Sequence, residues 1–399
     1  THVAEGLQSP RNTPSAHPSG DHHASRPQSF RPRRTRSRLW CRDGWRDRRL
    51  DRAVDRQRQH LGGLPGHRAP EHRRGRTERQ DQEQHGDRQT VLAYMQWQEE
   101  FKQAIRTQKE LEDFFELSFP STPYPLFIPK NFAAKIKASG IHSALGKQFL
   151  PQVNESDLNG KYDPIGDKVH SKGNQLIHRY SNRVLFTPTT VCPIACRYCF
   201  RKNELAHKDE MFNQNFEEAK TYLREHPEVN EVIFTGGDPL ILSNEKLAHF
   251  IQDFSEITSL KYIRFHSRTP IILPSRIDEG LIDVLVSARS LFKRSLLMIH
   301  VNHRDEIDKE VEAAITRLTD AGIELYSQTV LLKGVNDQTE TLANLFTYLS
   351  DLKIRPYYLH HPDQTLGAMH FTMPLEIGRR IVHPLHDLLP GWALPQYVI

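Results

Sequence analysis

The sequence predicts an α/β protein whose main body is a partial (β/α)6 barrel of the TIM type, preceded by an N-terminal helical extension. Three observations indicate this fold. Apolar runs typical of strands alternate with amphipathic stretches typical of helices, the repeat is about 30 residues long, and six such units follow one another. Connections of this length favour right-handed βα units in a parallel sheet. A doubly wound sheet fits the same rhythm and is the alternative.

The predicted strands are short runs rich in β-branched and aromatic residues, which begin near Arg183, Glu231, Lys261, Leu296, Ile323 and Ile354. The amphipathic stretches between and after them are Phe216–Glu225, Asn244–Phe254, Gly280–Ala288, Glu306–Ala321, Thr339–Leu349 and Leu375–Leu388. Ahead of the units, 96–115 and 131–138 have helical periodicity, whereas 150–178 has few periodic apolar positions and is predicted to form loops.

Charge divides the chain into two parts. The 399 residues carry a formal net charge of +5, but residues 1–94 alone hold 20 Arg, no Lys and 11 acidic residues. Such a segment buries too little apolar surface to offset its ordering entropy, so we expect 1–94 to be a disordered or non-native Arg-rich segment, with Met95 as the real start. A basic arm that binds nucleic acid is the alternative. We expect 95–177 to be the helical region and 178–399 the barrel.

Several classes of protein are excluded by the remaining composition. No apolar run approaches the 18 residues that a membrane span needs, and no secretory leader opens the chain. Three of the four cysteines lie within eight residues, with only Cys41 elsewhere, whereas a disulfide framework would distribute them through a small domain. We therefore expect a cytoplasmic protein, without membrane association, whose cysteines bind a metal or cofactor.

The clustered cysteines follow the first predicted barrel strand. Cys192, Cys196 and Cys199 form a C-x3-C-x2-C pattern within TTVCPIACRYCFRKN. Three thiolates on one loop can bind three irons of a 4Fe–4S cluster and leave the fourth iron open. Structural zinc is the alternative, with His207 as a candidate fourth ligand. A redox C-x-x-C pair would leave Cys192 without a role.

Further motifs accompany the cluster, in an order that resembles the radical S-adenosylmethionine (SAM) superfamily and, within it, the lysine 2,3-aminomutase family. They are HRYSNRVLF, CRYCFR, FTGGDPL, HSRTPIILPSRI, HVNHRDEI, SQTVLLKGVND and RPYYLHHPDQTLGAMHF. The resemblance covers most of residues 95–399 and implies an isomerase that converts L-lysine to β-lysine on a radical SAM barrel. CRYCFR and PYYLHHPD are most similar to the branch that makes (R)-β-lysine for elongation factor P.

The resemblance also implies where SAM is held. SAM would bind the open iron of the cluster, and one electron would cleave it to a 5′-deoxyadenosyl radical. Gly236, Gly237 and Asp238 match an element that contacts the SAM amino group, and glycine suits a backbone that must approach a ligand closely. Ser267 and Arg268 match an element that lines the same cavity. An ordinary strand-end turn and a solvated surface arginine are the alternatives.

Pyridoxal 5′-phosphate (PLP) is the third cofactor that the resemblance implies. Arg179, Tyr180 and Arg183 match positions that hold its ring and phosphate, and Arg201 matches the arginine that binds the substrate carboxylate. Arginine suits both tasks because its planar fork is always charged and can bond two oxygens. Asp337 matches an aspartate that reads the far ammonium of lysine, although it could instead cap the helix near Thr339.

One expected residue is missing. PLP enzymes hold the cofactor as an imine to a lysine. By the resemblance, this catalytic lysine lies beyond Ile399, so we expect the chain to be C-terminally truncated and its own catalytic lysine to be unknown. Lys202 and Lys333 do not replace it: Lys202 belongs to the cluster loop, and Lys333 aligns with an arginine. The histidines His300, His303, His360, His361 and His370 are expected to be polar residues at the barrel mouth rather than ligands of a second metal.

Two other functions compete with the aminomutase prediction. A different radical SAM enzyme could act on RNA or protein without PLP, with residues 1–94 as the RNA-binding arm. A zinc-binding interaction protein would have no catalytic role. We expect L-lysine as the small-molecule substrate and the elongation factor P pathway as a partner, and the sequence leaves the oligomeric state open.

Overall fold

The computed structural model describes residues 96–173, 175–207 and 215–399. The predictions for residues 1–94, for Cys41 and for Met95 lie outside the described residues. The side chain of His207, the candidate fourth ligand of zinc, lies outside them as well.

A single sheet of eight strands, in the order β1 to β8, forms the centre of the described protein. Strands β2 to β8 run parallel, and β1 pairs antiparallel with β2. Because each strand lies beside its neighbour in sequence, the chain winds in one direction, as it does in a barrel; the doubly wound alternative is wrong. The strands are β1 Leu176–Tyr180, β2 Arg183–Thr189, β3 Glu231–Gly236, β4 Tyr262–Ser267, β5 Arg294–His300, β6 Glu324–Val330, β7 Arg355–His360 and β8 Gln396–Val398.

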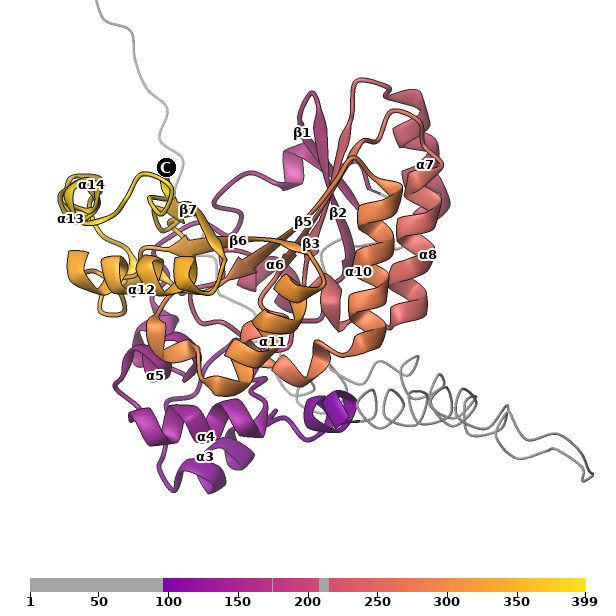
Figure 1. The fold of residues 1–399 in the computed structure, drawn as a ribbon. Coiled ribbons are helices and arrows are strands. Elements are labelled where there is room, and N and C mark those ends of the chain that lie inside the picture. Colours follow the sequence, from indigo (N-terminus) through magenta and orange to yellow (C-terminus); the bar gives the residue numbers. More distant parts are fainter. Residues whose placement is uncertain (1–95, 174, 208–214) are drawn as a thin grey trace, which may run out of the picture. The chain divides into compact units, whose positions relative to one another are not determined.

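The helices follow the predicted βα rhythm, and Figure 1 shows α8 and α10 side by side along the sheet. Each of these two helices begins at a side-chain cap, from Ser243 and Asp278 respectively, which satisfies an otherwise free N–H group. The helices are α3 Gln108–Phe115, α4 Lys130–Ser139, α5 Ala144–Phe149, α6 Lys202–His207, α7 Phe216–Glu225, α8 Asn244–Ser255, α9 Thr269–Ile272, α10 Glu279–Leu291, α11 Lys309–Asp320, α12 Thr339–Asp351, α13 Leu375–Val382 and α14 Leu385–Leu388.

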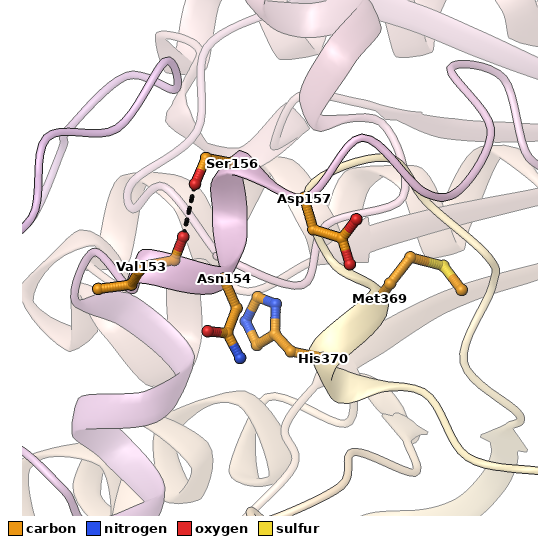
Figure 2. A pocket seen from close by; sticks show the side chains of 6 residues that line it. All are labelled: Val153, Asn154, Ser156, Asp157, Met369 and His370. Carbon is orange, nitrogen blue, oxygen red and sulfur yellow. Dashed lines mark hydrogen bonds between the residues drawn. The ribbon is translucent and has the colours of Figure 1, made fainter.

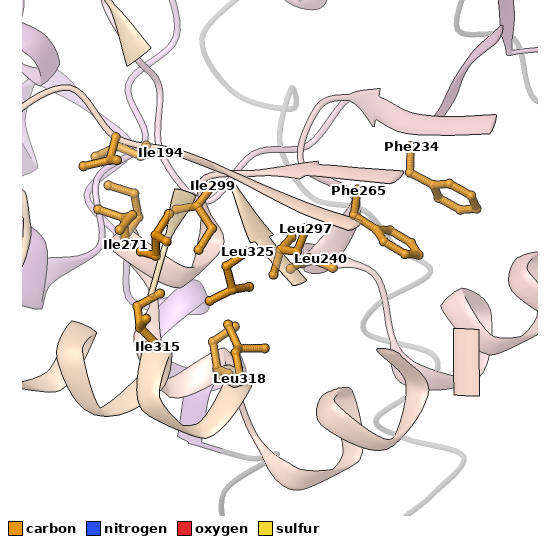
Figure 3. Packing of buried hydrophobic residues seen from close by; sticks show 14 of the residues in the cluster. Ile194, Phe234, Leu240, Phe265, Ile271, Leu297, Ile299, Ile315, Leu318 and Leu325 are labelled. Atoms are coloured by element: carbon orange, nitrogen blue, oxygen red, sulfur yellow. The ribbon is translucent and has the colours of Figure 1, made fainter. Parts of the chain in front are cut away.

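The hydrophobic core lies between the sheet and these helices. Figure 3 shows Leu297 and Leu325 of adjacent strands near Ile315 and Leu318 of α11, with Phe265 and Phe234 farther along the sheet. Along β4 and β6, buried residues alternate with half-buried ones, as expected where one face of a strand packs on helices and the other lines the barrel interior. The partial (β/α)6 barrel predicted from the sequence is therefore confirmed, with β2–β7 as its six strands.

Two local predictions were wrong. Residues 176–178 were predicted to form loops but belong to β1, because a two-residue turn at Ser181 and Asn182 folds this strand back onto β2. The helix predicted over 96–115 is interrupted, since Ile105 pairs with Ile128 and Thr107 starts α3 with a capping box. Apolar periodicity alone does not reveal either event. Among the described residues, no helix is both long and apolar enough to cross a membrane.

Candidate functional site

The cysteine loop leaves the carboxyl end of β2 and is held by its backbone. The N–H of Ala195 donates to the carbonyl of Phe127 at 2.9 Å, and the N–H of Arg197 donates to that of Gln148 at 2.8 Å. Cys199 N–H closes a turn on the carbonyl of Cys196 at 3.3 Å. Backbone hydrogen bonds to the N-terminal helical region thus hold the loop in this conformation without help from a metal.

The three thiols share an environment that favours a cationic partner. Burial raises the pKa of Cys192 and Cys196, and that of Cys199 to about 12; the charge of Cys199 raises the pKa of Cys192 further, and the charge of Cys196 raises that of Cys199. A zinc ion needs tightly gathered ligands at about 2.3 Å, whereas a 4Fe–4S cluster binds each thiolate to a different iron. Three thiols on one loop fit such a cluster, whose binding would deprotonate them.

Arg197, between Cys196 and Cys199, anchors the loop from below. Its side chain is 1% exposed and pairs with Glu155, also 1% exposed, through Nε at 2.7 Å and through Nη2. Nη1 donates to a backbone carbonyl at 3.0 Å, so each of its nitrogens has a partner. Lys202 joins this group of side chains below the loop. Its Nζ donates to the carbonyls of Arg197 and Gly367 and lies 3.7 Å from the centre of the Tyr124 ring.

These contacts give Lys202 a structural role. Burial lowers the pKa of Lys202 to about 7, against the raising effect of Glu155. Since its ammonium is already bonded to two carbonyls, it is poorly placed to form an imine with a cofactor.

The glycines after β3 allow a close approach of two backbones. Gly236 has a φ of +98°, in the region that favours glycine. A Cβ on Gly237 would lie 2.4 Å from the carbonyl oxygen of Val191, on the cysteine loop. Both glycines are therefore needed for the strand end to contact the loop that carries the cysteines.

Asp238 joins the ends of β3 and β4. It is 4% exposed, and its carboxylate accepts from the Ser267 hydroxyl at 2.8 Å and from the N–H groups of Arg268, Thr269 and Leu240 at 2.7–3.0 Å. Burial raises its pKa, in spite of these bonds. Because protein donors occupy both carboxylate oxygens, Asp238 holds the ends of β3 and β4 together through its bonds to Ser267 and the following backbone.

Arg268 is buried and only partly satisfied. Its Nη2 donates to Glu306 at 2.6 Å and to Gln148 at 3.2 Å. Its Nε and Nη1 are buried and have no partner in the described structure. The surface-arginine alternative for Arg268 is therefore wrong, because the side chain is 6% exposed.

Arg201 and Arg179 are brought together by a residue that the sequence analysis did not single out. Nη2 of Arg201 lies 2.5 Å from one oxygen of Asp167, and Nη2 of Arg179 lies 3.2 Å from the other. Nε and Nη1 of Arg201, and Nε of Arg179, are buried and unpartnered in the described structure. Donors left over in this way are what an anionic ligand would satisfy.

Tyr180 and Arg183 lie at the other end of β2 from the cysteines. The Arg183 guanidinium stacks 3.8 Å from the centre of the Tyr180 ring, and Tyr180 is 52% exposed. Arg183 is also close enough to the Tyr358 hydroxyl of β7 to oppose the rise in that group's pKa, which burial raises to about 12. Arg183 therefore contributes positive charge near the Tyr358 hydroxyl.

Asp337 is half-buried after β6, and the described structure shows no hydrogen bond or ion pair of its carboxylate. Its neighbour Asn336 bonds the backbone of Leu332, Asn302 and Val330, which fixes the loop. The N-cap of α12 is Gln338, without a side-chain cap bond, so the capping alternative for Asp337 is wrong.

Three half-buried histidines, His266, His300 and His360, lie near the strand ends on the same side. Burial lowers the pKa of His266 and His300 well below the ordinary value and that of His360 to about 4, so all three are neutral at pH 7. Nε2 of His300 lies 3.3 Å from the hydroxyl of Tyr198, on the cysteine loop. His266 was missed in the sequence, because a histidine inside a strand has no distinguishing spacing.

Two cavities lie outside this constellation. One of about 440 Å³ is formed by Val153, Asn154, Ser156, Asp157, Met369 and His370, and Figure 2 shows the His370 ring beside Asn154. The other, of about 370 Å³, is lined by His361, Pro362, Gln364, Thr372, Met373 and Pro374. None of the cysteines or of the candidate ligand-binding residues lines either cavity.

The comparisons with known proteins agree with this geometry. Residues 186–346 match the model of the Radical SAM superfamily. The chain is 35% identical over 275 residues to L-lysine 2,3-aminomutase of Escherichia coli, covering 68% of this chain and 79% of that protein. It is 34% identical to L-lysine 2,3-aminomutase of Buchnera aphidicola, covering 69% of this chain and 81% of that one. With L-lysine 2,3-aminomutase of Clostridium subterminale the identity is 33%, covering 75% and 72%.

Proposed function

Because the chain belongs to the lysine 2,3-aminomutase family, which consists of radical SAM isomerases, we propose that it is an L-lysine 2,3-aminomutase that forms β-lysine. The observation that carries this proposal is the set of buried, unpaired arginine donors beside the cysteine loop. A buried donor without an acceptor is costly, so these donors call for anionic ligands. SAM, PLP and the amino acid each bring an anionic group.

Cys192, Cys196 and Cys199 would hold the 4Fe–4S cluster, which supplies the electron that makes a radical from SAM when both are bound. Gly236 and Gly237 bring the end of β3 against the cysteine loop, and Arg268 offers buried nitrogens without a partner in the described structure. The neutral histidines add hydrogen-bonding groups without adding charge. These residues position SAM and exclude water from its reactive bond.

Arg179, Tyr180 and Arg183 are the proposed PLP-binding residues. PLP, when bound, supplies the ring that carries the migrating amino group. An aromatic ring stacked on an arginine offers PLP a flat surface and a fixed positive charge. The unpartnered Nε of Arg179 offers a second donor.

Arg201 and Asp337 would recognise the two ends of lysine. Arg201 offers paired donors to the α-carboxylate, and Asp337 offers a half-buried carboxylate, without a partner in the described structure, to the far ammonium. This combination favours lysine over glutamate, because an acidic group would repel a second carboxylate. Binding both ends fixes the position of the carbon from which hydrogen is removed.

We further propose that β-lysine formed here serves the elongation factor P pathway, as the motifs CRYCFR and PYYLHHPD suggest. We also propose that 178–399 is the catalytic unit, that 95–177 supports it, and that 1–94 has no part in the reaction. Removal of residues 1–94 should leave cluster content unchanged.

The proposal is tested by anaerobic reconstitution with iron and sulfide, followed by incubation with SAM, PLP and L-lysine and chiral analysis of the amino acid products. We expect a brown protein that cleaves SAM. Cys192→Ala, Cys196→Ala and Cys199→Ala should each abolish the iron–sulfur absorbance and SAM cleavage, whereas Cys41→Ala should change neither. Full SAM cleavage by any of the first three variants would contradict a radical SAM site. Salt-sensitive RNA binding that is lost without residues 1–94 would favour the RNA-modifying alternative instead.

A further inference from the structure

Asp167 bridges the two arginines to which the proposed function gives different ligands. One carboxylate oxygen lies 2.5 Å from Nη2 of Arg201 and the other lies 3.2 Å from Nη2 of Arg179. Asp167 is 2% exposed and Arg201 is 3% exposed, so the contact is shielded from water. In such surroundings a charged hydrogen bond is short, directional and strong.

The backbone around Asp167 is itself fixed. Asp163 accepts from the N–H of Asp167 at 2.9 Å and from the N–H of Lys168 at 3.0 Å. Asp167 then begins the short 3-10 helix Lys168–His170. The carboxylate therefore belongs to a rigid turn, and it can hold the two arginines rather than follow them.

The donors that remain show which edge of Arg201 faces a ligand. Arg201 donates to Asp167 through Nη2 alone. Its Nε and Nη1 are buried and have no partner among the described residues. The buried Arg197 of the same loop differs, since each of its nitrogens has a protein partner. Arg197 is a structural arginine, and Arg201 is an arginine held ready for a further anion.

We propose that Asp167 is a positioning residue that holds Arg201 toward the substrate α-carboxylate and, through its second oxygen, ties this arginine to the PLP-binding Arg179. The inference rests on the proposed function and deepens it. Asp167 touches neither ligand. It sets the direction of the two guanidinium planes, and through them the preference of the site for an amino acid with a free carboxylate.

The test compares L-lysine with L-lysinamide, which has the same ammonium groups but no carboxylate. Dissociation constants are measured by isothermal titration with the reconstituted, SAM-bound protein, without PLP. We expect the wild-type protein to bind L-lysine about tenfold or more tightly than the amide, as a charged hydrogen-bonded pair provides. In Asp167→Asn this ratio should fall toward one, and Asp167→Glu should restore part of it.

A general loss of structure would weaken both ligands alike and leave the ratio unchanged, so the ratio reports on Arg201 specifically. Asp157→Asn is the matched control, because Asp157 lies in the same segment and its side chain bonds only within its own turn, to Asn159. It should keep the wild-type ratio. Iron content and thermal unfolding of each variant show that the cluster and the fold are present.

The two possible failures are distinguishable. If the wild-type protein prefers L-lysine and Asp167→Asn keeps that preference, the positioning role is wrong while the substrate proposal stands. If the wild-type protein shows no preference for L-lysine over the amide, the substrate proposal fails and the inference built on it fails too.

Discussion

The buried arginines beside the cysteine loop differ in how far the protein satisfies them. Arg197, which anchors the loop, bonds Glu155, a backbone carbonyl and a hydroxyl group, so that each of its nitrogens has a protein partner. Arg201 and Arg268 donate through Nη2, and their Nε and Nη1 are buried without a partner in the described structure. A buried donor left unpaired costs about 1–3 kcal/mol. The difference therefore separates an arginine that holds the loop from two that await ligands.

The largest expected effect on folding stability comes from breaking the ion pair of Arg197 with Glu155. Arg197→Ala would leave the Glu155 carboxylate buried, and the cationic neighbour that the described structure still shows is Lys202, 3.7 Å away. Removing one partner of a buried ion pair costs about 3–5 kcal/mol of folding free energy. Urea unfolding of the cluster-free protein should show this loss. A variant as stable as the wild-type protein would mean that Arg197 does not support the loop.

The same pair should also make stability depend on pH. Burial alone would raise the pKa of Glu155, but the hydrogen bond and charge of Arg197 outweigh burial and lower it below the ordinary value of 4.5. A carboxyl with a lowered pKa in the folded state stabilises the protein above its unfolded pKa and loses that contribution as the pH falls through the folded value. The unfolding free energy of the cluster-free protein should therefore decrease below about pH 4.5.

The control for this pH dependence is Glu155→Gln, which cannot titrate. Its unfolding free energy, measured by urea titrations between about pH 3 and pH 7, should be lower than that of the wild-type protein at neutral pH and should change less on acidification. Parallel curves for the two proteins would show that other groups cause the acid sensitivity.

The arginines with unpartnered nitrogens should affect ligand binding as well as stability. Arg201→Gln and Arg268→Gln break the buried pairs with Asp167 and Glu306, but they also remove buried donors that lack partners in the described structure. The free energy of unfolding should therefore fall by less than in Arg197→Ala. Ligand binding should suffer more: about tenfold or more for L-lysine in Arg201→Gln, and similarly for SAM in Arg268→Gln. Titrations of each ligand, together with urea unfolding, give both quantities. Unchanged affinities would remove the distinction between the two kinds of arginine.

The sequence was sufficient for the barrel but not for the partners of these arginines. The apolar runs placed the starts of the six strands β2–β7 within two residues, because each run must be buried on both sides of a parallel sheet. The cysteines, Arg201 and Arg268 belong to recognisable motifs. Glu155 and Asp167 lie in a segment without periodicity, and their role depends on which side chain they meet in space. Local sequence does not contain that information.

The smallest effect is expected where an arginine–carboxylate pair is exposed. Arg294 and Glu324 form such a pair at the start of β5 and β6, with side chains 48% and 41% exposed. Water already solvates both groups well, so the pair gains little by forming, and salt screens what remains. Arg294→Ala should therefore cost about 0–1 kcal/mol in urea unfolding, less in high salt, and should leave cluster content and ligand affinities unchanged. A loss as large as that of Arg197→Ala would mean that burial does not decide how much an arginine pair contributes in this protein. The comparison of Arg197 with Arg201 and Arg268 would then lose its physical basis.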